Sequence, residues 1–183
     1  MVRAVCSGSF DPVTCGHIDI FERASKMFDE IIVSVFYNIR KEPWLPVEER
    51  VRLIREATRH IKNLRACSFS GLLTDFMREE KASVIVRGLR SVTDFEYEMQ
   101  EAQTLKHLDK RIETIFILTS QEYYFVSSSG IRELALFHGN VHGLVPACVE
   151  EAIRVRVGAK EDGASSAAGK SETESGLVSD DGK

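Results

Sequence analysis

The sequence predicts a single α/β domain: a five-stranded, doubly wound parallel sheet with helices on both faces. Short runs of Val, Ile and Phe recur along the chain, and stretches with helical spacing of apolar residues lie between them. Strands that are apolar throughout suit a parallel sheet whose two faces are both covered. Because strand and helix alternate within a length typical of one domain, the doubly wound arrangement is expected.

The predicted strands are short and rich in β-branched and aromatic residues. They are Arg3–Cys6, Ile31–Phe36, Leu64–Phe69, Ser83–Val86 and Glu113–Leu118. In sheets of this kind, ligands bind beyond the carboxyl ends of the strands, near the point where the strand order reverses. We therefore expect the functional residues in the loops that follow these strands.

The predicted helices repeat apolar residues at spacings of three and four. In the first, Ile18, Phe21 and Ala24 share one side, and the second begins near Pro46, a residue favoured in a first turn. The predicted ranges are His17–Phe28, Pro46–Arg59, Leu72–Glu80, Thr93–Leu108, Ser129–Phe137 and Pro146–Val157.

Composition limits the classes of function. The 183 residues include 24 Lys and Arg against 28 Asp and Glu, a net charge of −4, which argues against broad binding to nucleic acid or membranes. No apolar run is long enough to span a membrane, and the apolar start is too short for a signal peptide. The four cysteines lack C-x-x-C spacing, which predicts reduced thiols and a cytoplasmic protein. They are Cys6, Cys15, Cys67 and Cys148.

The end of the chain differs from the rest. Residues 159–183 are dominated by Gly, Ala, Ser and acidic residues and contain no aromatic side chain. Such a segment buries too little surface to offset its ordering entropy. We therefore expect a folded domain over 1–158 and a disordered acidic tail over 159–183.

The first candidate motif joins the first strand to the first helix, as Ser7-Gly8-Ser9-Phe10-Asp11-Pro12-Val13-Thr14-Cys15-Gly16-His17. Gly8 permits close backbone approach, and His17 falls at a helix start, where free N–H groups form a ready phosphate site. The segment is neither a Walker A loop nor a dinucleotide fingerprint. Taken alone, His17 could equally cap or pack the helix.

Two later segments are also suited to phosphate. Arg87 and Arg90 lie at a strand end in Val86-Arg87-Gly88-Leu89-Arg90, where they could grip phosphate or form ion pairs with the following Asp94-Phe95-Glu96-Tyr97-Glu98-Met99-Gln100. The third segment is Tyr123-Tyr124-Phe125-Val126-Ser127-Ser128-Ser129-Gly130-Ile131-Arg132. Its serines could cap a helix or donate hydrogen bonds to phosphates.

Together these segments resemble the phosphopantetheine adenylyltransferase family. Thr14-Cys15-Gly16-His17 is similar to the T/H-x-G-H signature of the nucleotidyltransferase superfamily, and R-G-L-R followed by D-F-E-Y-E-M-Q is more specific to this family. Val126-Ser127-Ser128-Ser129-Gly130-Ile131-Arg132 resembles its serine element. The resemblance spans roughly residues 3 to 157 and implies a Rossmann-like fold.

The resemblance also implies an activity. Family members reversibly transfer the adenylyl group of ATP to 4′-phosphopantetheine, giving 3′-dephospho-coenzyme A and pyrophosphate, a step in coenzyme A biosynthesis. Attack is in line, and His17 matches the residue that stabilises the transition state. Mg²⁺ is the implied cofactor, with no protein ligand named. A homohexamer built as a dimer of trimers and feedback inhibition by coenzyme A are implied as well.

The matching positions give a set of expected site residues. The ATP site comprises Ser9, Phe10, His17, Gly88, Leu89, Arg90, Glu98, Tyr123, Tyr124, Phe125, Val126, Ser127, Ser128 and Ser129. The phosphopantetheine site comprises Ser9, Lys41, Leu73 and Arg87. Ser9 replaces the usual threonine, and Tyr124 stands where a small or polar residue is usual. Arg40 is an alternative to Lys41, and Leu73 could equally belong to the core.

Two rival functions remain open. A sister nucleotidyltransferase acting on another phosphorylated acceptor would share His17, although the R-G-L-R segment favours phosphopantetheine. A non-catalytic domain that senses nucleotide or coenzyme A would bind ATP without turnover. A zinc site formed by His138, His142 and Cys148 is disfavoured for want of a fourth ligand. Cys15 offers a thiol beside the site, whose alkylation is expected to inhibit.

Overall fold

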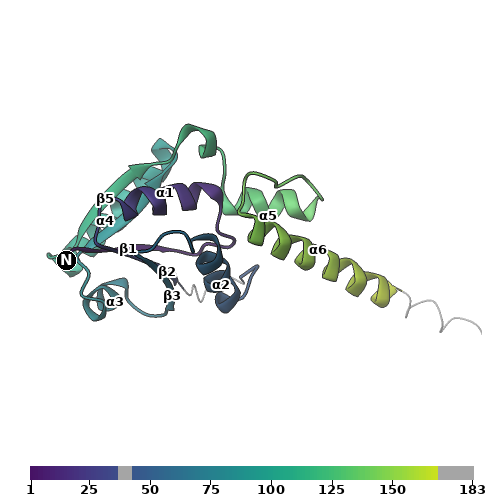
Figure 1. Cartoon of the computed structure of the whole chain (residues 1–183), viewed down its shortest axis with the longest axis horizontal. Coiled ribbons are helices and arrows are strands. Elements are labelled where there is room, and N and C mark those ends of the chain that lie inside the picture. The colour runs from purple at the N-terminus through teal and green to yellow at the C-terminus, as the bar shows by residue number, and fades with distance from the viewer. Residues whose placement is uncertain (37–42, 169–183) are drawn as a thin grey trace, which may run out of the picture.

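The computed structural model describes residues 1–36 and 43–168, with side chains through residue 158. Its centre is a five-stranded parallel sheet in the order β3-β2-β1-β4-β5 (Figure 1), so the strand order reverses between β1 and β4. This confirms the predicted doubly wound α/β fold. The strands are β1 (Arg3–Gly8), β2 (Glu30–Phe36), β3 (Leu64–Phe69), β4 (Val84–Leu89) and β5 (Glu113–Leu118).

Helices cover both faces of the sheet. Side chains alternate along β1: Ala4 and Cys6 join a core cluster built with helices α1, α2, α5 and α6. Val5 points the other way, into a second cluster built with α3 and α4. The helices are α1 (Cys15–Ser25), α2 (Val47–Ala57), α3 (Leu73–Glu79), α4 (Val92–Leu108), α5 (Ser128–Leu136) and α6 (Ala147–Ala168), with a short 3₁₀ helix, η1 (Gln121–Tyr123).

Two strands run further than predicted. β1 continues to Gly8 and β4 to Leu89, so Arg87 and Gly88 lie within a strand and not in the loop that follows it. Pairing with β5 holds this extension, because Gly88 is in register with Ile117 and Leu89 with Leu118. Gly88 also permits close packing, since a Cβ there would come 3.1 Å from Cγ1 of Ile20.

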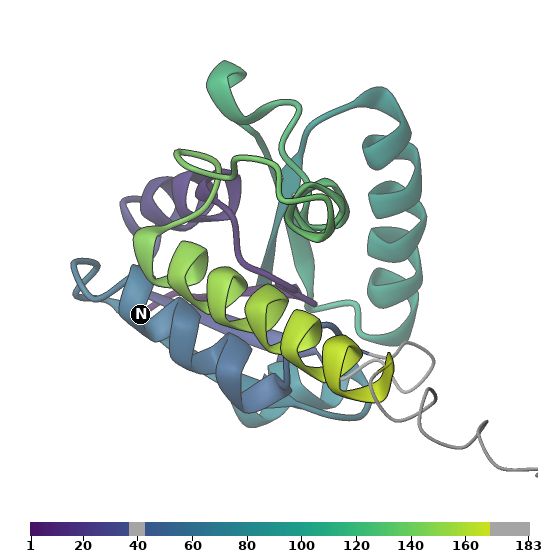
Figure 2. The same cartoon turned by 90° about the vertical axis from the view of Figure 1, so that its right-hand side faces the viewer.

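The last helix passes the predicted domain boundary. α6 lies beside α2 (Figure 2) and extends away from the sheet (Figure 1), ending at Ala168 and not near residue 158. Residues 159–168 include alanines, a lysine and a glutamate, which favour helix. Disorder of 169–183 stays a prediction, because these residues lie outside the described part. In the described part, no helix is long and apolar enough to cross a membrane.

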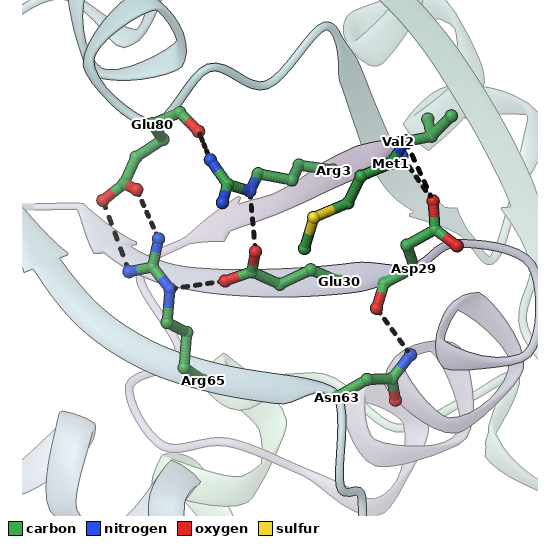
Figure 3. Close-up of polar contacts among 8 residues, drawn as sticks. All are labelled: Met1, Val2, Arg3, Asp29, Glu30, Asn63, Arg65 and Glu80. Carbon is green, nitrogen blue, oxygen red and sulfur yellow. Dashed lines mark hydrogen bonds and ion pairs between the residues drawn. The ribbon is translucent and has the colours of Figure 1, made fainter.

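Charged side chains tie together the amino ends of three strands (Figure 3). Glu30 of β2 accepts hydrogen bonds from Arg3 of β1 at 2.7 Å and from Arg65 of β3 at 2.9 Å. Arg65 also pairs with Glu80, whose carbonyl accepts from Arg3 at 3.0 Å. This network lies at the edge opposite the carboxyl ends of the strands, so it secures the sheet away from the expected site.

Candidate active site

A cavity of about 430 Å³ opens where β1 and β4 end, at the reversal in strand order. Its volume is within the range of small-molecule sites. Most of the lining comes from the three segments singled out in the sequence: the loop after β1 with the start of α1, the end of β4 with α4, and the start of α5. The lining residues are Cys6, Ser7, Gly8, Ser9, Phe10, Thr14, Gly16, His17, Ile20, Phe21, Val86, Arg87, Gly88, Arg90, Asp94, Glu98, Thr119, Val126, Ser127, Ser128, Ser129 and Arg132.

Most of the expected site residues meet in this cavity, but some do not. Leu89 is buried and is not part of the lining, and Leu73 packs with Phe76 and Met77 on the other face of the sheet. Tyr124 and Phe125 are 58% and 70% exposed. Tyr123 packs at the edge of the larger core cluster, and none of these three aromatic residues is part of the lining. Lys41 and its alternative Arg40 lie outside the described residues.

His17 is held at the start of α1 by the residue that caps the helix. Thr14 is the N-cap, and its Oγ1 accepts a hydrogen bond from the backbone N–H of His17. In return, the Thr14 backbone N–H donates to Nδ1 of His17 at 3.0 Å. Because an amide N–H can only donate, Nδ1 must be unprotonated, and the neutral ring carries its proton on Nε2.

The surroundings of His17 keep the imidazole neutral. Burial, together with the smaller effect of the nearby positive charge of Arg90, lowers the pKa of His17 to about 4. The ring of Phe10 meets the imidazole edge to face, with centroids 5.1 Å apart. At neutral pH the group at this end of the cavity is therefore an uncharged hydrogen-bond donor of fixed orientation.

The serine run begins α5 and combines capping with exposure to the cavity. Ser127 is the N-cap, and its hydroxyl accepts from the Gly130 N–H at 3.0 Å. Ser128 donates from its hydroxyl to the carbonyl of Pro12 at 2.8 Å, which ties α5 to the loop after β1. The first amides of a helix have no intrahelical acceptor, so the starts of α1 and α5 both present N–H groups and positive dipole ends at the cavity.

Arg87 is compensated by carboxylates of α4. Its guanidinium lies 3.2 Å from Glu98 and 2.9 Å from Glu101, and donates to the carbonyl of Ser7 at 3.0 Å. Burial raises the pKa of Glu98, while Arg87 opposes that rise. The ion-pair network with the following helix, which the sequence left open beside phosphate binding, is therefore present.

The other two arginines of the cavity differ in whether a carboxylate compensates them. Arg90 pairs with Asp94 at 3.0 Å and donates to the carbonyl of Val126 at 3.1 Å. Arg132 of α5 donates to the carbonyl of Asp11 at 2.5 Å, and among the described residues it pairs with no carboxylate. Of the three guanidinium groups in the lining, Arg87 and Arg90 thus have carboxylate partners, and the charge of Arg132 is left for a ligand. Such a site favours an anion.

The described residues do not form a metal cage. No three His, Cys, Asp or Glu side chains gather in a metal-binding arrangement within 1–36 and 43–158. The two cavity carboxylates, Asp94 and Glu98, face arginines. Of the residues considered for zinc, His142 pairs with Glu150 at 3.1 Å, and Cys148 lies against the carbonyl of Leu53.

Known proteins resemble this chain along most of its length. The model of the family described as cytidylyltransferase-like matches residues 5–134. The phosphopantetheine adenylyltransferase of Syntrophomonas wolfei is 50% identical over 157 residues, which cover 86% of this chain and 98% of the relative. That of Shouchella clausii is 51% identical, covering 84% and 97%.

The chain belongs to the phosphopantetheine adenylyltransferase family.

A solved structure agrees at the level of the fold. A candidate nicotinate-nucleotide adenylyltransferase from Vibrio parahaemolyticus superposes with a TM-score of 0.64, covering 86% of this chain and 95% of that one. Its sequence identity is 16%, so it shows the shared architecture and carries no argument about substrate.

Within this phosphopantetheine adenylyltransferase fold, three site residues were not assigned from the sequence. Thr14 stands three positions before His17, the spacing of a capping box, although that pattern usually has Glu or Gln where this chain has His. Asp94 lies in the first turn of α4, four residues after Arg90, and Arg132 follows Ser128 by four on one face of α5. These positions relative to His17, Arg90 and Ser128 are the sequence signals that could have identified the three residues.

Proposed function

We propose that this protein transfers the adenylyl group of ATP to 4′-phosphopantetheine, giving 3′-dephospho-coenzyme A and pyrophosphate in a reversible reaction of coenzyme A biosynthesis. The observation that carries the proposal is 50% identity with a curated phosphopantetheine adenylyltransferase over 98% of its length. The cavity supports it independently, because its three guanidinium groups, of which Arg132 has no carboxylate partner among the described residues, and its helix N-termini suit polyanionic substrates.

His17 is the residue to which we assign transition-state stabilisation. An oxygen of the acceptor phosphate attacks the α-phosphorus of ATP in line, the bond to the bridging oxygen breaks, and pyrophosphate leaves. Negative charge shifts onto the α-phosphate oxygens, where a fixed donor is most effective. Nε2–H of His17 is such a donor, because Thr14 holds Nδ1 as an acceptor. No proton need be taken by the ring.

The phosphate tail of ATP is assigned to the arginines and the start of α5. Arg132 lacks a carboxylate partner among the described residues, and Arg90 is partly exposed while paired with Asp94. The first-turn amides of Ser128 and Ser129 supply further donors. These groups would hold the β- and γ-phosphates and stabilise the departing pyrophosphate.

The acceptor side is assigned to Ser9, Arg87, Lys41 and Leu73. Ser9 and Arg87 line the cavity. Arg87 is neutralised by Glu98 and Glu101, so it would offer directed N–H groups more than net charge. Lys41 lies outside the described residues, and Leu73 is buried in the second core cluster, so both assignments rest on the family resemblance.

Magnesium is the proposed cofactor, carried on the phosphates of ATP. The cavity carboxylates already pair with arginines, so they are not free to form a protein cage around a metal ion. The site instead suits an ion whose ligands are water molecules and the phosphates of ATP. When bound, Mg²⁺ would neutralise phosphate charge.

Assembly into a hexamer of two trimers is proposed on the surface of α4. This helix buries only Leu105 among its described side chains, while Val92, Tyr97 and Met99 are exposed. Exposed apolar side chains of this kind suit contact with a second copy. We also propose a cytoplasmic location. Coenzyme A is the expected feedback inhibitor, because it shares most of its structure with the product.

The testing experiment measures pyrophosphate release from ATP and Mg²⁺ with one acceptor at a time: 4′-phosphopantetheine, nicotinate mononucleotide or glycerol 3-phosphate. Turnover with phosphopantetheine alone is expected. Turnover with another acceptor would assign the protein to a sister reaction. Binding of ATP without turnover on any acceptor would support the non-catalytic alternative.

A further inference from the structure

Asp19 of α1, two residues beyond His17, forms contacts that the activity described above does not use. Its Oδ2 accepts hydrogen bonds from the backbone N–H of Ser120 at 3.2 Å and from the Ser120 hydroxyl at 2.9 Å. Ser120 lies just after β5, at the start of the segment that leads to α5. The Asp19 side chain is 17% exposed, so these bonds are largely shielded from water.

Arg23, one turn further along α1, extends this contact. Its Nη1 lies 3.2 Å from Oδ2 of Asp19 and donates to the carbonyl of Leu118 at 2.6 Å. The Asp19–Arg23 pair therefore holds the chain on both sides of Thr119, a residue that lines the cavity. Thr119 is itself anchored by its N–H, which donates to the carbonyl of Leu89 at 2.8 Å.

Close packing reinforces the junction at the start of α1. A Cβ on Gly16 would lie 3.2 Å from Cβ of Tyr123 and 3.6 Å from Cγ2 of Thr119. The first turn of α1, which carries His17, is thus in van der Waals contact with segment 119–123. A displacement of this segment would therefore alter the packing of the helical turn that holds His17.

The far end of the same segment is anchored separately. The carbonyl of Val126 accepts from Arg90 at 3.1 Å, and the Ser128 hydroxyl donates to Pro12 at 2.8 Å. Between these anchors and Thr119, the exposed Tyr124 and Phe125 bury little surface. The near end of segment 119–129 is held by the Thr119 bond to Leu89 and the packing of Tyr123, and the side chains that bond to it come from α1.

We infer that Asp19 is a positioning residue for ATP, which fixes the near end of segment 119–129 against the helix that carries His17. The inference rests on the proposed function, in which this segment contacts ATP. Asp19 itself is not part of the cavity lining, so it acts through Ser120 and Thr119.

The test compares Asp19→Ala and Asp19→Asn with the wild type. ATP affinity is measured by calorimetric titration without acceptor, and steady-state constants are measured with both substrates. Asp19→Ala is expected to raise the Kd and KM for ATP about tenfold, the scale of losing hydrogen bonds to a charged group. The kcat and the KM for phosphopantetheine are expected to change less than about twofold. Asp19→Asn should restore part of the ATP affinity, because its amide oxygen can still accept from Ser120.

A double-mutant cycle locates the effect. Ser120→Ala removes the hydroxyl bond, and it should weaken ATP binding in the wild type but add little in the Asp19→Ala background. Additive effects of the two substitutions would overturn the assigned contact.

Glu30→Gln provides the matched control. Glu30 is 20% exposed and also receives two charged hydrogen bonds, but it lies at the opposite edge of the sheet (Figure 3). The substitution Glu30→Gln should lower the melting temperature without changing the affinity for ATP. If Asp19→Ala lowers stability in the same way and leaves the Kd for ATP unchanged, or changes both KM values and kcat together, the inference is wrong. A wild type that binds ATP but fails to adenylate phosphopantetheine would refute the proposed function, while the calorimetric comparison would still test Asp19.

Discussion

The backbone N–H of Thr14 donates to Nδ1 of His17 at 3.0 Å, while the Thr14 hydroxyl caps the helix that carries His17 in its first turn. One reciprocal contact therefore does two things. It stabilises the start of α1, and it fixes the tautomer of the imidazole so that Nε2–H is the free donor. The group assigned to stabilising the α-phosphate is thus oriented before any substrate arrives.

Replacing His17 should separate these two roles. His17→Ala is expected to lower kcat by about 10²–10³-fold, as expected for loss of a charge-stabilising donor. It also removes half of the capping contact and should destabilise the protein slightly. His17→Gln keeps a residue that serves in capping boxes, so it should recover stability but not kcat. Initial rates and melting curves of the two variants check this, and near-normal turnover by His17→Gln would contradict the assigned role.

The low pKa of His17 predicts a specific dependence on pH. The folded-state pKa is about 4, below the ordinary value of 6.5, so the unfolded chain binds more protons between these limits. The free energy of unfolding contributed by His17 is therefore present above pH 6.5 and lost as the pH falls toward 4. Relative to His17→Gln, the wild type should lose stability on acidification through this window. Chemical denaturation at several pH values measures the difference, and a constant difference would show that the imidazole is not held neutral.

The architecture could be predicted from the sequence because most of the strands are short, nearly continuous apolar runs. The positions of His17, Arg90 and the serines followed from strand ends and helix starts, which topology brings together. The exact end of β4 was missed because Gly88 normally marks a strand boundary, whereas here its small size admits Ile20.

Other features depend on tertiary contacts that local patterns do not encode. The ion pairs of Arg87 with Glu98 and Glu101 were one of two open alternatives until α4 was placed beside β4. The contact of Asp19 with Ser120 spans about a hundred residues along the chain, so no local spacing signals it. Leu73 falls in a core cluster on the opposite face of the sheet, which only the packing of α3 reveals.

Gly8 should not tolerate a side chain. A Cβ there would lie 2.9 Å from Cζ of Phe10, whose ring also packs edge to face on His17. Gly8→Ala is expected to displace that ring, destabilise the protein by about 1–3 kcal/mol as overpacking does, and reduce kcat through His17. Adding Phe10→Leu should relieve the overlap and recover stability. Thermal melts and initial rates check both, and a fully active, stable Gly8→Ala would show that Phe10 moves freely.

The thiol of Cys15 should react slowly but with a consequence for activity. Burial raises its pKa above the ordinary value of 9.0, and the charge of Glu122 raises it further, so little thiolate exists at neutral pH. Cys6 should be slower still, because complete burial raises its pKa to about 12. Complete alkylation of Cys15 is expected to raise the KM for ATP by crowding segment 119–123. Mass spectrometry identifies the labelled thiol, Cys15→Ser is the control, and an unchanged rate after full labelling would refute the expectation.

Arg132 is expected to bind the phosphate tail of ATP, since it is the cavity guanidinium that pairs with no carboxylate among the described residues. Arg132→Ala should raise the KM for ATP and the inhibition constant for pyrophosphate by about tenfold or more, the scale of a charge-assisted bond. The KM for phosphopantetheine should change little. Arg132→Lys should recover only part of the loss, because a lysine cannot reproduce the guanidinium's paired donors. Arg154→Ala, which removes an exposed arginine of α6 paired with Glu151, is the control and should change none of these constants. Equal increases in the KM values for ATP and phosphopantetheine would contradict this assignment. They would indicate that Arg132 acts by holding the loop after β1 through its hydrogen bond to the Asp11 carbonyl.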